Sequence, residues 1–180
     1  MALLLPLLLL AALLQAPSAE AGWDIGYYGY WGTWGSSDYC PNGHHVVRFK
    51  VQIEGIQHDG VDTALNAIRL ECSNGQTLYS KEAPWGHWYE SPYSSEGFTS
   101  ADFLLEGNQR SGDDTAANNL ELVTPNGRSM IVGPTYWGDW QGTQRCTYNK
   151  KIVGFKTRVE DSCGGDCDDT ALNGVKFYCR

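Results

Sequence analysis

Three acidic motifs recur along the chain and are the first residues to consider for chemistry. Each reads Asp-Thr-Ala-x-Asn, and the repeated positions are Asp62, Asp114 and Asp169 with Asn66, Asn118 and Asn173. Two of the motifs carry a second carboxylate, in Asp113-Asp114 and Asp168-Asp169. Two carboxyl groups about 5 Å apart can carry out glycoside transfer with retention, so these pairs are candidates for that reaction.

The repetition of the acidic motif favours a structural role instead. A residue that occurs in all three repeats is explained by what the repeats share, which is turn geometry and packing. Short Asp and Asn side chains accept backbone N–H bonds in turns, and Asn also tolerates a positive φ. Neighbouring residues of an extended chain point to opposite sides, which separates the two carboxylates of each pair. We therefore interpret the motif as structural and assign no catalytic residue.

A second motif, Trp-Gly-x-Trp, recurs in the same order as Trp31–Trp34, Trp85–Trp88 and Trp137–Trp140. Two motifs that share one period indicate a triplicated unit. The Trp side chains could stack on sugar rings, but their repetition favours an aromatic core beneath each sheet. A better candidate for an exposed patch that binds glycans or partners is a second set of aromatic residues: Tyr27, Tyr28, Tyr30, Trp88, Tyr89 and Tyr93.

The elements that must position these motifs are β-strands. Val46–Glu54 alternates apolar and polar residues, which is typical of a half-buried antiparallel strand. Ile68, Leu70 and Cys72 alternate with charged residues in the same way, and Asn74-Gly75 then predicts a hairpin turn. The other two repeats follow this plan, and no stretch predicts a helix.

The third repeat ends at Arg180 before it can make a return strand, whereas the strand-like segment Trp23–Tyr28 precedes the first Trp motif. An unpaired strand would expose its backbone donors and acceptors at a sheet edge. We therefore expect the N-terminal strand to close the third sheet. Each unit would hold four strands: one before the Trp motif, one through it, and one on either side of the acidic motif. The predicted fold is all-β, with three four-stranded sheets that form a prism with internal pseudo-threefold symmetry.

The first 21 residues read as a secretory signal peptide. Met1–Leu14 is almost wholly Leu and Ala, and Ala19 and Ala21 form an A-x-A cleavage pattern. Residues 22–180 are expected to form a single domain, with units at about 31–79, 85–132 and 137–180. A net charge of −8 without basic clusters argues against nucleic acid and anionic membranes as partners. We predict a secreted, extracellular protein without a membrane span.

The six cysteines can be paired from the repeat. Cys40 and Cys72 occupy two positions of the first unit, Cys146 and Cys179 occupy the same two positions of the third, and the second unit lacks both. We therefore predict the disulfides Cys40–Cys72 and Cys146–Cys179, with a local pair between Cys163 and Cys167. Zinc binding by these thiols is the alternative, which an oxidising compartment disfavours.

The histidines show no metal-ligand spacing with carboxylates, and we expect all four to be exposed in loops or turns: His44, His45, His58 and His87. No metal and no cofactor is expected.

The Trp-Gly-x-Trp and Asp-Thr-Ala-x-Asn motifs together resemble the vitelline membrane outer layer protein I family, from about Trp23 to Arg180. The resemblance implies a β-prism of three Greek-key sheets, in a secreted protein of an egg coat or another surface secretion. It also implies a capacity to build longer N-acetylchitooligosaccharides, although it supplies no defined catalytic residues. We expect a structural and interaction protein that binds other coat proteins or glycans. The alternatives are a lectin-like binder or a transglycosylase acting on N-acetylglucosamine oligomers.

Overall fold

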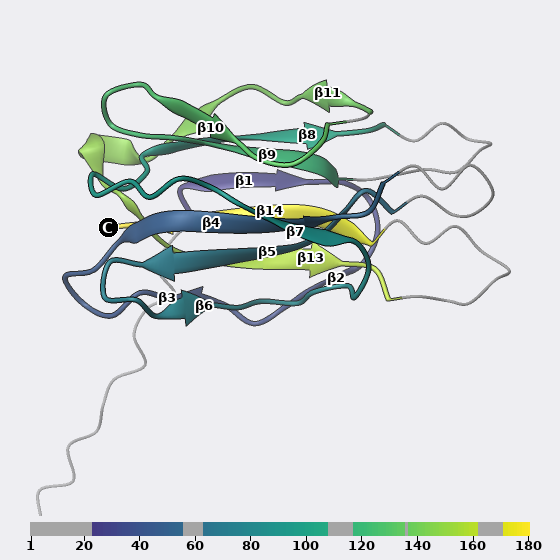
Figure 1. The fold of residues 1–180 in the computed structure, drawn as a ribbon, viewed down its shortest axis with the longest axis horizontal. Helices are drawn as coiled ribbons and strands as arrows, with labels where there is room; N and C mark the ends of the chain where they lie inside the picture. The colour runs from purple at the N-terminus through teal and green to yellow at the C-terminus, as the bar shows by residue number, and fades with distance from the viewer. Residues whose placement is uncertain (1–22, 56–62, 108–116, 136, 162–170) are drawn as a thin grey trace, which may run out of the picture.

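The computed structural model describes residues 23–55, 63–107, 117–135, 137–161 and 171–180. The signal peptide expected at residues 1–21 lies outside this part. The described residues form antiparallel strands and a single 3-10 turn at Thr147–Asn149. The strands run along the long axis of the molecule and build three sheets around a common core (Figure 1). The predicted all-β fold is confirmed.

Sheet B takes its strands from the first two repeats, in the spatial order β6-β5-β4-β7. The bounds are β4 Val46–Ile53, β5 Leu65–Cys72, β6 Thr77–Leu78 and β7 His87–Glu90. Sheet C has the order β10-β9-β8-β11, and β12 also pairs with β8. Its bounds are β8 Ser100–Leu105, β9 Ala117–Val123, β10 Ser129–Ile131, β11 Asp139–Trp140 and β12 Gln144–Arg145.

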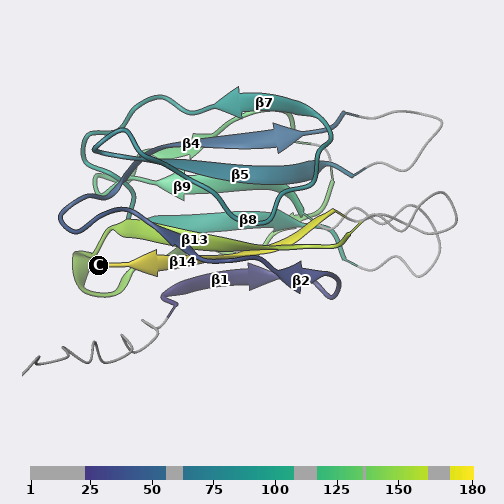
Figure 2. The same cartoon turned by 90° about the horizontal axis from the view of Figure 1, so that it is seen from below.

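Sheet A joins the two ends of the chain, in the order β1-β14-β13-β2, and β3 also pairs with β13. The bounds are β1 Ile25–Tyr28, β2 Thr33–Trp34, β3 Asp38–Tyr39, β13 Ile152–Val159 and β14 Leu172–Cys179. In Figure 2, β1 and β2 lie with β13 and β14 on the side of the molecule opposite β7. The strand β1 pairs with β14 in the register Ile25↔Phe177, which confirms that an N-terminal strand closes the third sheet.

Each sheet is a Greek key. Two long strands form its centre, a shorter strand pairs at one edge, and a fourth strand reaches the opposite edge by a long connection. The fourth strand carries the Trp motif of a different repeat: β7 of the second repeat pairs with β4, β11 of the third pairs with β8, and β2 of the first pairs with β13. The four strands expected for each unit are therefore present and are divided between two sheets. The long connection after each return strand carries the Trp motif across to the previous sheet.

The core lies where the inner faces of the three sheets meet. Phe49 and Phe155 hold equivalent places on β4 and β13, and Phe103 lies two residues further along on β8; all three are fully buried. Burial of such a side chain stabilises the fold by roughly 1.5–3 kcal/mol. The predicted alternation of β4 is seen as well, with Arg48 and Lys50 facing outward. Gln52 is the exception, because its outward amide is covered and donates to the carbonyls of Pro84 and Gly86.

Both long disulfides have the expected partners. Cys40 is bonded to Cys72 and Cys146 to Cys179, with Cα–Cα distances of 5.7 and 5.8 Å. Each joins the segment before a central strand to the end of its neighbour. Cys163 and Cys167, whose local pairing was predicted, lie outside the described residues.

Candidate functional site

The Asp-Thr-Ala-x-Asn motif builds a buried turn at the start of β5 and of β14. Asn66 and Asn173 are fully buried, and the Asn66 side-chain amide donates to Thr63 Oγ1 (2.8 Å) and to the Ala64 carbonyl (3.1 Å). The positive φ of this turn falls on the alanines, at 49° in both Ala64 and Ala171, and not on the asparagines. The Asn173 Oδ1 atom accepts the Trp31 backbone N–H at 3.3 Å, which ties the two repeated motifs together.

The equivalent Asn118 is likewise fully buried, on β9. The acidic members of the motif, Asp62, Asp114 and Asp169, lie outside the described residues, as do Asp113 and Asp168. Their structural interpretation remains a prediction.

The repeated tryptophans do not form an aromatic core. Trp88 and Trp140 are 37% and 38% exposed, and Trp31, Trp34, Trp85 and Trp137 are half-buried. Of the six, Trp85 packs against the core from its edge. The prediction of a Trp core is therefore wrong, because phenylalanines of the long central strands already fill the centre. The second Trp of each motif stands instead on the outer face of a sheet.

The expected exposed patch is also corrected. Tyr27 is only 4% exposed, because it points inward from β1 and its hydroxyl lies 2.6 Å from the Ala101 carbonyl oxygen. Tyr28 and Tyr30 are exposed beside sheet A, whereas Tyr93 and the half-buried Tyr89 belong with Trp88 to sheet B or the loop that follows it. The six residues therefore do not form one surface.

A cross-strand pair of like charges occupies the same place on the outer face of all three sheets. The pairs are Lys50↔Arg69 in sheet B, Asp102↔Glu121 in sheet C and Lys156↔Lys176 in sheet A. Like charges directly opposite each other on antiparallel strands are destabilising. Sheets B and A surround their cationic pairs in different ways.

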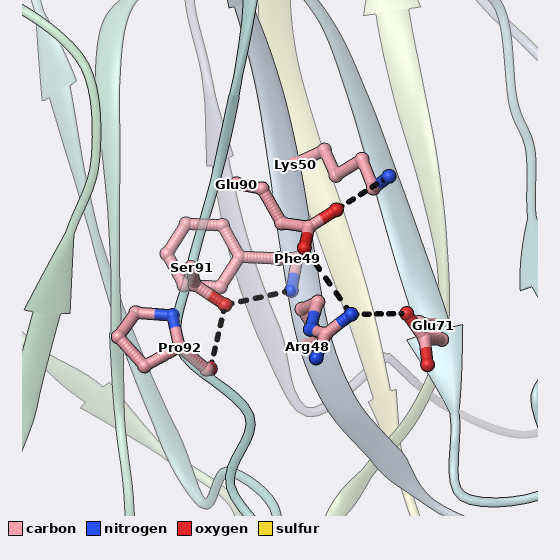
Figure 3. A network of polar contacts seen from close by, with 7 residues as sticks. All are labelled: Arg48, Phe49, Lys50, Glu71, Glu90, Ser91 and Pro92. Atoms are coloured by element: carbon pink, nitrogen blue, oxygen red, sulfur yellow. Dashed lines mark hydrogen bonds and ion pairs between the residues drawn. The ribbon is translucent and has the colours of Figure 1, made fainter.

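Sheet B neutralises its cations with carboxylates. Lys50 Nζ lies 2.5 Å from Glu90, and Arg69 forms a two-bond pair with Glu82 at 2.9 Å for each bond. Arg48 joins this network by contacting Glu71 at 3.3 Å and Glu90 at 3.2 Å (Figure 3).

The hydrogen bond from Lys50 lowers the pKa of Glu90, which keeps this carboxylate ionised. A general acid for glycoside transfer requires a raised pKa, so Glu90 is not suited to that role. The Arg69 guanidinium also covers the Trp88 ring at 4.2 Å, which leaves this tryptophan engaged within its own sheet.

Sheet A surrounds its two cations with aromatic rings. Lys156 Nζ lies 4.7 Å from the Trp23 ring centre and 5.5 Å from that of Trp34. Lys176 Nζ lies 4.8 Å from Trp34 and 5.5 Å from Tyr28. Among the described residues, neither lysine has a carboxylate within ion-pair distance. We call these five residues the Lys–aromatic surface: Trp23, Tyr28, Trp34, Lys156 and Lys176.

The Lys–aromatic surface continues into a second group of rings. Trp23 stacks with Tyr39 at 6.3 Å and meets Tyr178 edge-on at 6.4 Å. Tyr39 lies flat on Gly154, where an added Cβ would come within 2.3 Å of its Cδ1 atom. A glycine on the outer face of β13 therefore makes room for a ring. The arrangement can bind an apolar surface and an anion together.

Sequence reasoning identified Tyr28 but missed Trp23, Lys156 and Lys176, and it placed Trp34 in the core. A signal for the lysines was present in the alternation of their strands, since both occupy outward positions between buried residues. Their direct opposition follows only from the register of β13 with β14.

A small polar depression lies between the loop after β7 and the β9–β10 hairpin. It has a volume of about 210 Å³, and its lining includes Tyr93, Glu96, Asn126 and Arg128. None of its lining residues belongs to sheet A.

The histidines are more buried than expected. His87 is exposed, but His44 and His45 are half-buried, with His44 Nδ1 3.0 Å from Ser73 Oγ and His45 Nε2 3.2 Å from the Ser95 carbonyl oxygen. His58 lies outside the described residues. In the part of the chain that the structure covers, no group of three or more potential ligands could hold a metal ion.

We predict that His45 makes stability depend on pH. Burial lowers the pKa of His45 in the folded state, with nearby Lys151 and His44 acting in the same direction. The unfolded chain then binds a proton more readily, so the contribution is present above pH 6.5 and is lost as the pH falls below it. Urea unfolding at pH 7.5 and pH 5.5 should show a loss of stability that is smaller in His45→Gln. The exposed His87→Gln variant should keep the full loss, and an unchanged pH dependence in His45→Gln would contradict the prediction.

The family model described as vitelline membrane outer layer protein I matches residues 24–180. A protein of Homo sapiens named vitelline membrane outer layer protein 1 homolog is 33% identical over 194 residues, which cover 98% of this chain and 95% of the human protein. The corresponding Mus musculus protein is 32% identical over 151 residues, covering 79% of this chain and 74% of its own length.

Solved lectin structures share the β-prism fold. A mannose-binding lectin from Champedak superposes with a TM-score of 0.55 at 15% identity, covering 91% of this chain and 99% of its own. A prostate-specific WGA16 glycoprotein lectin reaches a TM-score of 0.59 at 12% identity, with coverage of 87% and 98%. At such low identity the likeness establishes the fold alone. Within the described residues, no helix is long and apolar enough to cross a membrane.

Proposed function

Because the chain belongs to the vitelline membrane outer layer protein I family, we propose that it is a secreted protein of an extracellular coat or surface secretion that acts by binding glycans. The apolar segment Met1–Leu14 and the small residues before Gly22 support secretion. The two long disulfides suit an oxidising, extracellular environment.

The observation that carries glycan binding is the Lys–aromatic surface. Sugar rings offer apolar C–H faces that pack on aromatic rings, and Trp and Tyr supply such contacts with little loss of conformational entropy. Tyr28 is 59% exposed, and Trp34 lies beside it with ring centres 6.2 Å apart. The two rings meet edge to face on one sheet, and a sugar ring could pack on either. The lectins with the same fold add support from proteins whose names describe sugar binding.

The rest of the fold suits a durable component of a coat. The three sheets share one core. In two of the three repeats, a disulfide joins the segment before one central strand to the end of its neighbour. A stable scaffold of this kind would present its outer faces to neighbouring proteins or glycans. Association with other coat proteins is therefore part of the proposal.

The test is a glycan array probed with protein secreted from cells that express the full chain, followed by calorimetry on the best ligands. We expect binding that Trp34→Ala weakens at least tenfold. Trp88→Ala is the matched control, because it removes the equivalent ring from sheet B, where Glu90 and Glu82 neutralise the two cations. N-terminal sequencing of the secreted protein should begin at Gly22.

An array without any ligand above background would overturn the glycan-binding proposal and leave association with coat proteins alone. Equal losses in Trp34→Ala and Trp88→Ala would show that the site is not on sheet A. Incubation with N-acetylglucosamine hexamers, followed by mass spectrometry, tests the transglycosylase alternative. Longer products would replace the binding proposal with an enzymatic one.

A further inference from the structure

We infer that the Lys–aromatic surface selects glycans that carry sulfate esters. The inference rests on the proposed glycan binding and adds the chemical class of the ligand. It starts from the three equivalent pairs of like charges, of which only the Lys156–Lys176 pair is both cationic and without a carboxylate partner in the described residues.

The contrast with sheet B shows what sheet A lacks. The equivalent cations, Lys50 and Arg69, are neutralised by Glu90 and Glu82. In sheet A the neighbouring strands supply aromatic rings at this place, and a ring offers an ammonium group only a partial negative charge on its face. Two positive charges therefore remain available to an anion from outside.

The carboxylates at the margin of sheet A are directed to other groups. Asp24 accepts the Cys179 backbone N–H at 3.1 Å and the Thr147 hydroxyl at 3.2 Å. Asp38 accepts the backbone N–H groups of Tyr39 and Tyr79, both at 2.9 Å. These contacts hold the two acids away from the lysine pair and leave its charge in place.

The two lysine side chains leave the sheet at adjacent positions. Lys156 and Lys176 face each other across adjacent strands, where Cβ atoms are about 4.5–5.5 Å apart. Trp34 lies within cation–π distance of both, and the stem of Lys176 lies over Gly26, 3.4 Å from the place of an added Cβ. A single anionic group can therefore meet both lysines while its sugar ring stacks on Trp34 or Tyr28.

The cation type favours sulfate over carboxylate. An arginine fork matches a planar carboxylate with two parallel bonds, whereas lysine acts as a point charge. Two arginines near this face already have other partners: Arg158 donates to the carbonyls of Gly29, Tyr30 and Gly32 at 2.8–3.0 Å. Arg180, which lies over the Tyr178 ring, donates to Asn42 Oδ1 at 2.6 Å. The three free oxygens of a sulfate ester can reach two separate ammonium groups at once.

The net negative charge of the chain limits where a sulfated glycan can bind. A net charge of −8 repels polyanions from most of the surface. Binding of a sulfated glycan must therefore be local to the Lys–aromatic surface and must depend on its two lysines. This dependence makes the inference testable with two substitutions.

The experiment measures binding of the secreted protein to a heparin-derived hexasaccharide, to the same hexasaccharide after desulfation, and to N-acetylchitohexaose. The desulfated probe keeps its carboxylates, and the third probe is neutral. We expect desulfation to weaken binding at least tenfold. The double variant Lys156→Gln/Lys176→Gln should lose a similar factor in affinity for the sulfated probe and keep its affinity for the other two probes. Lys50→Gln is the matched control on sheet B and should stay within twofold.

The outcomes separate this inference from the proposed function. Equal affinity for the sulfated and desulfated probes would mean carboxylate recognition, and preference for N-acetylchitohexaose would mean a neutral ligand. Either result overturns sulfate selection and leaves glycan binding intact. Binding to none of the probes or array glycans overturns both. Equal losses in the double variant and in Lys50→Gln would overturn the assignment to sheet A, and thermal unfolding of each variant verifies that it is folded.

Discussion

Gly86→Ala is expected to lower the free energy of unfolding by about 2–6 kcal/mol. Gly86 is the glycine of the second Trp-Gly-x-Trp motif and has a φ of +95°, which costs a residue with a side chain roughly 1–3 kcal/mol. An added Cβ would also lie 2.4 Å from the carbonyl carbon and oxygen of Ile53, and such overpacking costs a further ~1–3 kcal/mol. The backbone at the end of β4 cannot yield without disturbing the core.

Gly127→Ala is the matched control for this prediction. Gly127 also has a positive φ, of +84°, but an added Cβ there meets nothing within 4 Å. Denaturant unfolding should therefore show a clearly smaller loss for Gly127→Ala than for Gly86→Ala. Equal losses would mean that the backbone angle alone fixes this glycine. The same contact recurs at Gly32 and Gly138, which explains why the glycine is repeated.

Tyr27→Ala is expected to destabilise the protein by about 3–5 kcal/mol, the usual range for removal of a buried aromatic side chain. The Tyr27 ring stacks with Phe103 at 6.0 Å, and its hydroxyl lies 2.7 Å from the Gly142 carbonyl and accepts the Gln144 backbone N–H at 2.8 Å. These contacts fasten the N-terminal strand of sheet A to sheet C. Burial raises the pKa of Tyr27, so its hydroxyl stays protonated at ordinary pH.

Two further substitutions define what Tyr27 contributes. Tyr27→Phe keeps the ring and removes the hydroxyl, and it should cost about 1–3 kcal/mol because buried backbone groups lose their partner. Tyr28→Ala changes the exposed neighbour and should cost under about 1 kcal/mol. Thermal unfolding that gave similar losses for Tyr27→Ala and Tyr28→Ala would contradict the role of β1 as the strand that fastens the sheets together.

The strands, the closing pairing and both long disulfides could be predicted because their signals are local or repeated. Alternation over eight residues fixes which face of β4 is buried, and paired absence of two cysteines in the second repeat identifies their partners. The same reasoning could have separated Tyr27 from Tyr28, since Ile25 and Tyr27 alternate with Gly26 and Tyr28 on β1.

The outward position of the tryptophans could not be predicted from the sequence, because the signal for it is neither local nor repeated. The strands that hold Trp34 and Trp140 are two residues long, which is too short for alternation to indicate a face. Each also pairs with a sheet whose central strands come from another repeat, so its neighbours depend on long-range topology. The Lys–aromatic surface needs the same topology, because its members come from both ends of the chain.

The closing of sheet A by β1 dictates an order of folding. All strands of sheet B lie between Val46 and Glu90, so this sheet can form while the rest of the chain is still being made. The backbone N–H of Cys179 meets Asp24 across 155 positions, and β1 has no partner strand until β14 exists. Ile25 and Tyr27 therefore stay without their partner strand until β14 has been made. The time between emergence of β1 and its pairing is the interval in which the nascent chain is most open to aggregation.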